Sequence, residues 1–362
     1  MKFIHIADMH LDSPFANLSE KEQMGEKRRL EQRQVFKKII DYIIEKEIDM
    51  LFIAGDLYEQ NYIKKSTIEY INEQFKRIPN SKIYITPGNH DPYIQNSYYA
   101  KYDWNENVTI FKGKIQKESM KKGTEEIDIY GYGFESPYVQ NLSFEGIEVD
   151  KEIPSILIMH ADLDIKESVY NPIEKETLIQ KGFNYVALGH IHKKNLDEQN
   201  AIHGKIIYPG STVSLGFDEL GSHGMVVGEI DKYRVKIDYV ELDQTEFKEF
   251  LIDVTDITYF EDLIEKLNDM DIKNNEYAKI VFEGKRNFEI DLLKVKKLIQ
   301  NERILKIKDN TKIKYNLEIL AREQTLKGIF TRKMLEKINE EIDDKQKEKI
   351  ERALEIGLEA LE

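Results

Sequence analysis

The sequence predicts an α/β protein in which two mixed β-sheets pack face to face with flanking helices, followed by a small α+β unit and a helical tail. Three observations lead to this prediction. Strand-like and helix-like segments alternate at first, strand-like segments then dominate up to about residue 242, and the composition shifts near residue 243. A chain of 362 residues also exceeds the usual size of one compact core, so more than one folded unit is expected.

The first segments follow the β-α-β-α-β order that gives parallel strands with right-handed crossovers. Apolar, β-prone runs at residues 3–7, 50–54 and 83–86 predict the strands. Between these runs, apolar side chains recur at helical spacing over residues 29–46 and 67–78. This part of the chain is therefore expected to form the first sheet and its helices.

Beyond about residue 107 the helical pattern thins out, and short apolar runs predict further strands. These runs are residues 127–134, 156–159, 185–188, 205–208, 225–230 and 235–242. The last two runs are typical of a hairpin that turns at Asp231 and Lys232. Together with the earlier strands, these runs indicate two sheets packed face to face with helices outside.

After residue 243 the pattern changes to strand, helix, strand, helix, strand, and from residue 317 it becomes helical and highly charged. We therefore expect a catalytic domain at 1–243, an α+β capping domain at 244–316 and a helical tail at 317–362. The tail carries two apolar stripes, Met334, Leu335, Ile338 and Ile342, and Ile350, Leu354, Leu358 and Leu361. The stripes either pack on the body of the protein or form a docking surface for a partner helix.

The composition excludes several classes of protein. The chain has no cysteine, which rules out disulfides, thiolate metal sites and a cysteine nucleophile, and fits a reducing cytoplasm. It has no signal-peptide pattern and no apolar run near the roughly 20 residues that span a bilayer, so a soluble protein without a membrane span is expected. A formal charge of −14 argues against a domain dedicated to coating nucleic acid, but leaves room for a local basic track.

Five predicted strands are each followed by a short motif rich in Asp, Asn or His. The motifs are Asp8-Met9-His10, Gly55-Asp56, Gly88-Asn89-His90-Asp91, Met159-His160-Ala161-Asp162 and Gly189-His190-Ile191-His192. In open α/β sheets, ligands bind beyond the carboxyl ends of the strands. Five distant segments are therefore expected to bring oxygen and imidazole ligands to one place. The remaining histidines, His5, His203 and His223, are interpreted as structural.

The residue types in these motifs suit two transition-metal ions. Residues two apart on an extended segment face the same way, so both side chains of an Asp-x-His or His-x-His pair can reach one ion. Imidazole and carboxylate suit Mn, Fe or Zn, and Asp56 has two oxygens with which to bridge two ions. Two such ions clamp a phosphoryl group and produce a bridging hydroxide that attacks phosphorus. His90, beside Asn89, is placed to assist the leaving oxygen.

Over about residues 1–242, these motifs resemble the calcineurin-like metallophosphoesterase superfamily. The resemblance implies a sandwich of two mixed sheets flanked by helices, and it implies His90 as the catalytic residue that assists the leaving group. The implied ligands are Asp8, His10, Asp56 and His192 for one metal ion, and Asp56, Asn89, His160 and His190 for the other.

Within the superfamily the chain resembles the DNA-repair exonuclease branch of the SbcD and YhaO type. The stretches that carry this resemblance are residues 3–12, Gly55-Asp56-Leu57-Tyr58, Tyr208-Pro209-Gly210-Ser211, Gly216-Phe217 and Gly224. It implies a cytoplasmic, Mn-dependent phosphodiesterase, most simply an exonuclease, with DNA as substrate. It also implies an SMC-like coiled-coil ATPase (SbcC/YhaN-like) as partner of the C-terminal helices, and a homodimer. One position departs from the branch, which often has histidine where this chain has Glu59.

Two other functions stay open on the sequence. One is a phosphodiesterase for a small nucleotide or a phospholipid-type diester, although that chemistry would not need the residues after Leu242. The other is a partner-binding scaffold with weak activity, against which the complete set of ligand residue types argues. A protein Ser/Thr phosphatase is disfavoured, because the bridging aspartate is not followed by the arginine that those enzymes carry.

Overall fold

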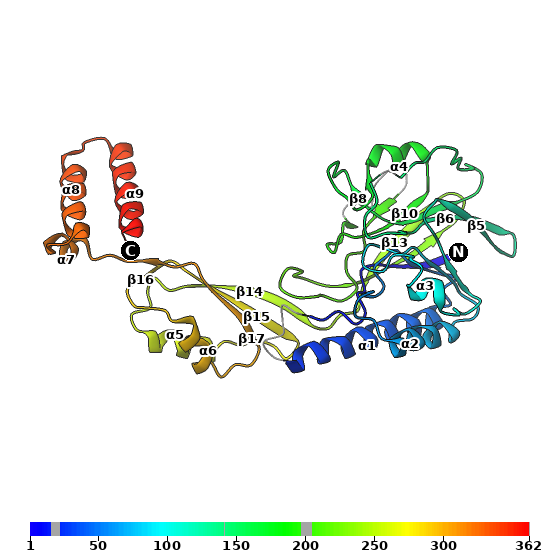
Figure 1. Cartoon of the computed structure of the whole chain (residues 1–362), viewed down its shortest axis with the longest axis horizontal. Helices are drawn as coiled ribbons and strands as arrows, with labels where there is room; N and C mark the ends of the chain where they lie inside the picture. Colours follow the sequence, from blue (N-terminus) through cyan, green and yellow to red (C-terminus); the bar gives the residue numbers. More distant parts are fainter. Residues whose placement is uncertain (16–21, 141, 197–204, 362) are drawn as a thin grey trace. The chain divides into compact units, whose positions relative to one another are not determined.

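The structure is a computed structural model that describes residues 1–15, 22–140, 142–196 and 205–361 (Figure 1). The chain divides into two compact units, residues 1–248 with 273–277, and residues 249–272 with 278–362. The expected domain boundaries after residues 243 and 316 stay predictions. His203, which was interpreted as structural, lies outside the described residues.

The first sheet has the strand order β13-β12-β1-β2-β3-β4. Its parallel strands are β1 (Lys2–Ile6), β2 (Met50–Ile53), β3 (Lys82–Ile85) and β4 (Val108–Ile110). The hairpin of β12 (Gly224–Ile230) and β13 (Val235–Glu241) joins this sheet antiparallel to β1. The sheet is therefore mixed, and its parallel strands all end at the same edge.

The second sheet has the strand order β11-β10-β7-β6-β5. Its parallel strands are β6 (Glu125–Tyr132), β7 (Ser155–His160), β10 (Tyr185–Gly189) and β11 (Lys205–Ile207), and β5 (Gln116–Lys122) pairs antiparallel to β6. Short elements complete the unit: α3 (Tyr98–Lys101), β8 (Asp162–Leu163) and β9 (Pro172–Ile173). The expected pair of mixed sheets is confirmed.

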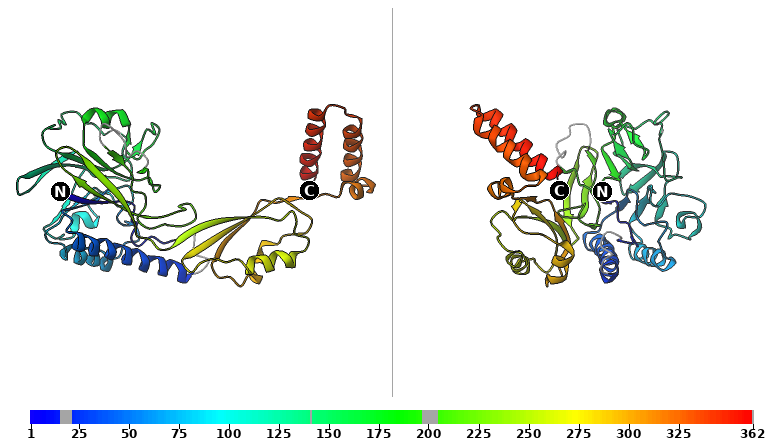
Figure 2. Two further views of the ribbon diagram at one scale, coloured as in Figure 1. Left: turned by 180° about the vertical axis from the view of Figure 1, so that it is seen from behind. Right: turned by 60° about the vertical axis from the view of Figure 1, so that its left-hand side comes forward.

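Helices cover the outer faces of the two sheets. α1 (Glu22–Lys46) and α2 (Lys65–Lys76) lie on one side of the unit and α4 (Lys175–Lys181) on the opposite side (Figures 1 and 2). Strand alternation sorts the side chains of β1 between the layers. Ile4 packs outward among side chains of α1 and α2, whereas Phe3 lies between the sheets, with its ring 4.8 Å from that of Tyr185.

The second unit contains most of an α+β part and a helical part. The α+β part has a sheet in the order β14-β15-β17, from β14 (Glu246–Asp253), β15 (Glu276–Glu283) and β17 (Ile304–Asp309). Residues 246–248 of β14 and 276–277 of β15 belong to the first unit. Its other elements are α5 (Phe260–Asn268), α6 (Leu292–Leu298), β16 (Lys285–Arg286) and β18 (Lys312–Ile313). None of the helices that the structure describes is long and apolar enough to cross a membrane.

The helical part consists of α7 (Leu317–Arg322), α8 (Leu326–Glu340) and α9 (Asp344–Ala360), with α8 and α9 side by side (Figure 2, left). The two apolar stripes meet here, because Ile338 of α8 packs with Leu354 and Leu358 of α9. Most of each stripe is thus used within the unit. Ile342, between the two helices, is 95% exposed.

His5 is a fully buried histidine in the centre of the sandwich. Its Nδ1 lies 2.9 Å from the Tyr185 hydroxyl and its Nε2 lies 3.1 Å from the Leu188 carbonyl oxygen. Burial lowers the pKa of His5 to about 3, although the bond to the Leu188 carbonyl opposes this shift. The ring is therefore neutral in the folded protein at any mildly acidic pH.

We predict that His5→Gln reduces the acid sensitivity of folding. Below its ordinary pKa, the histidine takes up a proton in the unfolded chain but not in the folded one, so stability falls as the pH falls. Between about pH 7 and about pH 5 this residue should cost about 2 kcal/mol of the free energy of unfolding. Urea unfolding of both proteins at the two pH values measures the difference. An equal loss in wild type and variant would contradict the prediction.

Candidate metal centre

The five motifs meet at one edge of the sandwich, where the parallel strands that precede them end. Asp8 follows β1, Asp56 follows β2 and Asn89 follows β3 in the first sheet. In the second sheet, His160 is the last residue of β7 and His190 follows β10. Each sheet therefore supplies part of the site.

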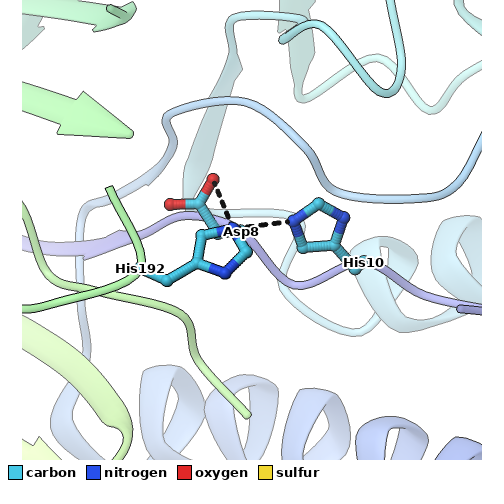
Figure 3. A group of neighbouring side chains, drawn as sticks. All are labelled: Asp8, His10 and His192. Carbon is cyan, nitrogen blue, oxygen red and sulfur yellow. Dashed lines mark hydrogen bonds and ion pairs between the residues drawn. The ribbon is translucent and has the colours of Figure 1, made fainter. Parts of the chain in front are cut away.

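One group of donor atoms comes from Asp8, His10 and His192 (Figure 3). His10 Nε2 lies 3.1 Å from His192 Nε2, which lies 4.0 Å from Asp8 Oδ1. Asp8 and His10 are buried, whereas the His192 side chain is 30% exposed. Asp56 Oδ2 lies 3.8 Å from His10 Nε2, so the Asp56 carboxylate borders this group.

A second group of donor atoms faces the same oxygen of Asp56. His160 Nε2 is 3.3 Å from Asp56 Oδ2 and 2.9 Å from Asn89 Oδ1. His190 Nδ1 is 3.2 Å from Asn89 Oδ1 and 3.2 Å from His160 Nε2. The structure thus brings all seven expected ligand residues together, with Asp56 beside both groups.

Two glutamates orient the imidazoles of the first group. His10 Nδ1 donates to Glu59 Oε1 at 2.8 Å, and His192 Nδ1 donates to Glu219 Oε1 at 2.5 Å. Such contacts fix the ring and leave Nε2 as the nitrogen that can bind an ion. No sequence pattern indicates the Glu219 contact, and Glu59 is notable in the sequence only as a departure from the histidine that the resembling branch often has at this position.

The imidazoles of the second group are oriented in the same way. His160 Nδ1 donates to the Ala54 carbonyl oxygen at 3.0 Å, which leaves Nε2 for an ion. His190 uses the opposite nitrogen, because its Nε2 lies 3.3 Å from Asp162 Oδ1 and its Nδ1 faces Asn89. Asp162 lies in one of the five motifs, but its position two residues after His160 gave no reason to pair it with His190.

His90 lies at the open side of the site and its side chain is 45% exposed. Its Nδ1 donates to Glu59 Oε2 at 3.0 Å, so one glutamate holds both His90 and His10. The hydrogen bond to Glu59 and the Asp56 charge raise the pKa of His90 to about 8, against the effect of burial. The protonated imidazole is therefore well populated at neutral pH.

Asp91 ties the second and third motifs together. Its carboxylate is buried and accepts hydrogen bonds from the backbone N–H groups of Asp56, Leu57 and Gly88 at 3.1, 2.7 and 2.7 Å. The Tyr99 hydroxyl donates to it at 2.7 Å. This contact explains why an aspartate ends the Gly-Asn-His-Asp motif, although it faces backbone rather than the donor groups.

The turns of the site need glycine and unusual backbone angles. A Cβ atom at Gly55 would collide with the His160 ring, and one at Gly88 would collide with the Asp56 carboxylate. Asp8, His10, Asp56 and His190 have positive φ angles of 50°, 46°, 51° and 102°. L-residues adopt such angles at a cost of about 1–3 kcal/mol each, and they cluster at functional sites.

The electrostatics of the two groups fit divalent cations. Burial alone would lower the pKa of His160, but the Asp56 and Asp8 carboxylates raise it to about 9. Burial likewise opposes a raised pKa at His192, and Glu219 and Asp8 outweigh it, again to about 9. The site therefore attracts positive charge. Its mixture of imidazole nitrogen and carboxylate oxygen suits Mn, Fe and Zn.

Residues 1–194 match the family described as calcineurin-like phosphoesterase. The chain is 26% identical over 277 residues to the uncharacterized metallophosphoesterase YhaO of Bacillus subtilis, which covers 74% of this chain and 67% of YhaO. It is 27% identical over 333 residues to the DNA double-strand break repair protein Mre11 of Methanocaldococcus jannaschii, which covers 86% of each chain. The protein of the same name from Methanopyrus kandleri is 25% identical over 269 residues, 67% of this chain and 57% of that one.

We predict that Asp56→Ala removes bound metal as well as hydrolytic activity, because the lost carboxylate borders both donor groups. Metal content after dialysis against Mn²⁺, measured by elemental analysis, should fall well below that of the wild type. Asp12→Asn is the matched control, since Asp12 accepts from Lys64 N at 3.1 Å and Thr67 Oγ1 at 2.6 Å and takes no part in either donor group. Full metal occupancy in Asp56→Ala would rule out that Asp56 serves both donor groups.

Proposed function

This chain belongs to the calcineurin-like phosphoesterase family, and we propose that it is a phosphodiesterase that cleaves DNA. One observation carries the proposal: the Asp56 carboxylate adjoins both groups of nitrogen and oxygen donors, with its Oδ2 3.8 Å from His10 Nε2 and 3.3 Å from His160 Nε2. Hydrolysis with two ions clamped on one phosphoryl group requires donor groups this close together. We further propose a cytoplasmic location, which suits a DNA substrate.

We assign the two ions to the two donor groups. The proposed ligands are Asp8, His10, Asp56 and His192 for one ion, and Asp56, Asn89, His160 and His190 for the other. Mn is our preferred ion, and Fe and Zn accept the same ligand types. When bound, such ions supply a hydroxide nucleophile at neutral pH and neutralise charge on the phosphoryl oxygens.

We propose His90 as the catalytic acid that protonates the leaving oxygen. Its Nδ1 is engaged by Glu59, so Nε2 is the nitrogen available to a substrate. The hydrogen bond to Glu59 raises the pKa of His90 and so favours a proton on the ring for transfer to the leaving group. Glu59 cannot itself donate to a phosphate. Its role in this proposal is to hold the acid and the ligand His10 in one arrangement.

DNA is the substrate that we favour, and an exonuclease is the activity. Two of the similar proteins are named DNA double-strand break repair proteins, and one of them is matched over 86% of its length. The match to that protein extends past the first 194 residues, so it includes chain beyond the phosphoesterase family match. A small diester substrate would leave those further residues without a role.

We propose that the helical part of the second unit binds a coiled-coil ATPase of the SMC-like type (SbcC/YhaN-like). Packing between α8 and α9 leaves several apolar side chains of this helical part exposed. Leu326, Ile329, Ile342 and Ile356 are 69%, 43%, 95% and 56% exposed. Apolar side chains of this kind suit an apolar face of a partner helix. Homodimer formation stays a prediction.

We predict Mn-dependent shortening of end-labelled linear duplex or single-stranded DNA by metal-stripped protein. His90→Asn should lose most of this activity, by about 10²–10⁴-fold, because general acid catalysis contributes that much. His5→Gln is a control histidine variant that should retain activity at neutral pH, since His5 contacts Tyr185 and the Leu188 carbonyl oxygen and belongs to neither donor group. Mn-dependent hydrolysis of bis(4-nitrophenyl) phosphate without cleavage of either DNA would contradict DNA as the substrate but agree with the proposed phosphodiester hydrolysis.

We predict that deletion of residues 320–362 removes ATPase binding and spares hydrolysis of bis(4-nitrophenyl) phosphate. The reason is that all proposed metal ligands lie in the first unit, whereas the deleted helices lie in the second. Ile342→Glu tests the same surface without a deletion, because this side chain is 95% exposed. Co-purification with the ATPase measures binding. Unchanged binding by both proteins would place the ATPase elsewhere.

A further inference from the structure

The segment between β11 and β12 has no regular structure, and its part up to Ser214 is nevertheless buried. Ser211, Thr212, Val213 and Ser214 have no exposed surface. Loops normally run over the surface, because buried backbone and hydroxyl groups need hydrogen-bond partners. Here Ser211 N donates to the His192 carbonyl oxygen at 3.0 Å. We call residues 208–224 the brace loop.

The brace loop places Glu219 against Nδ1 of the His192 ring. Glu219 Oε1 accepts from His192 Nδ1 at 2.5 Å, while Oε2 accepts from Ser211 Oγ at 2.7 Å and from Leu215 N at 3.1 Å. Both oxygens of the Glu219 carboxylate are therefore in use as acceptors.

A buried ion pair supports the brace loop from behind. Arg28 of α1 has no exposed surface, and its Nη2 donates to the Ser214 carbonyl oxygen and to Asp243 Oδ2, both at 2.8 Å. Asp243 Oδ2 also accepts from Ser214 N at 3.0 Å. Ser214 Oγ donates to the Glu219 carbonyl oxygen at 2.9 Å. Hydrogen bonds thus run without a break from Asp243, which follows β13, to His192.

We propose that Glu219 is a positioning residue that fixes His192 for one of the two ions, and that the Arg28–Asp243 pair holds the brace loop so that Glu219 can do so. This inference rests on the proposed function, because it concerns the ion assigned to His192. According to this proposal, the affinity for that ion depends on Asp243, which lies in the segment between β13 and β14.

A glutamine at position 219 cannot make all of these contacts. A carboxylate offers an acceptor on both sides, whereas an amide has one acceptor oxygen and one donor nitrogen. In either orientation of the amide, His192 on one side or Ser211 and Leu215 on the other lose their acceptor. We expect Glu219→Gln to weaken binding of one ion by roughly 10- to 100-fold, the usual effect of losing a group that orients a metal ligand.

The test is titration of the metal-free full chain with Mn²⁺, followed by the electron paramagnetic resonance signal of free Mn²⁺. Glu219→Gln should shift one of two binding steps and leave the other in place. Asp162→Asn is the matched control that should affect the other binding step, because Asp162 contacts His190, a proposed ligand of the other ion, at 3.3 Å. In a His192→Asn background, Glu219→Gln should add no further loss, whereas in a His190→Asn background its full effect should remain.

A second pair of variants tests whether the Arg28–Asp243 ion pair holds the brace loop in place. Asp243 and Glu31 both form ion pairs with Arg28, but Asp243 contacts the brace loop and Glu31 instead accepts from Thr245 Oγ1 at 3.2 Å. Asp243→Asn should weaken the same Mn²⁺ step as Glu219→Gln, and Glu31→Gln should leave both steps unchanged. Equal weakening by Asp243→Asn and Glu31→Gln would reduce the ion pair to a general stabiliser and overturn this part of the proposal.

The readout separates failure of this inference from failure of the proposed function. Two Mn²⁺ ions bound equally well by wild type and Glu219→Gln would overturn the inference alone. Additive losses from Glu219→Gln and His192→Asn would do the same. Wild type that binds two ions without cleaving DNA would overturn the proposed substrate and leave the inference standing. Wild type that binds no Mn²⁺ would overturn both.

Discussion

Asp8 and Asp56 place two carboxylates where water hardly reaches them, at 0% and 1% exposure. A buried charge of this kind is costly unless hydrogen bonds and opposite charge compensate it. The backbone N–H of His190 donates to both Asp8 oxygens at 3.1 Å, and the backbone N–H of His90 donates to Asp56 Oδ1 at 2.9 Å. The remaining compensation must be positive charge, which the surrounding histidines or bound ions provide. The cluster is thus organised around two anions that the fold cannot leave unpaired.

The backbone around these anions is held in conformations that an isolated peptide would avoid. Positive φ angles at Asp8, His10, Asp56 and His190 cost free energy, and the surrounding contacts must supply it. Asp91 fastens two of the turns through backbone N–H groups, and Gln32 of α1 donates to the carbonyl oxygens of Met9 and His10 at 3.0 and 2.9 Å. The contacts that offset this backbone strain are therefore made by residues that have no direct part in the chemistry.

Strong local patterns made the sandwich and the motif residues predictable from the sequence. Each motif follows an apolar run, and parallel strands bring their ends together. Strand β5 was not predicted, because in Gln116–Lys122 only Met120 is apolar and no alternation marks a polar edge strand. The helix expected at residues 29–46 begins at Glu22, since polar residues before 29 carry no apolar repeat. Glu219 escaped notice for another reason: its contact with His192 depends on the path of an irregular loop, which no local pattern encodes.

The division of the donor groups between two sheets has a consequence for folding. Asp8, Asp56 and Asn89 belong to one sheet and His160 and His190 to the other, and the sheets approach so closely there that a Cβ at Gly189 would strike the Ala54 carbonyl oxygen. A one-residue slip of any of these strands would turn its side chains to the opposite face and dismantle the ligand set. An ion bound between the two sheets would bind only the correctly assembled sandwich, so it would stabilise the native strand pairing by mass action. Ion binding would thereby favour correct assembly of the two sheets.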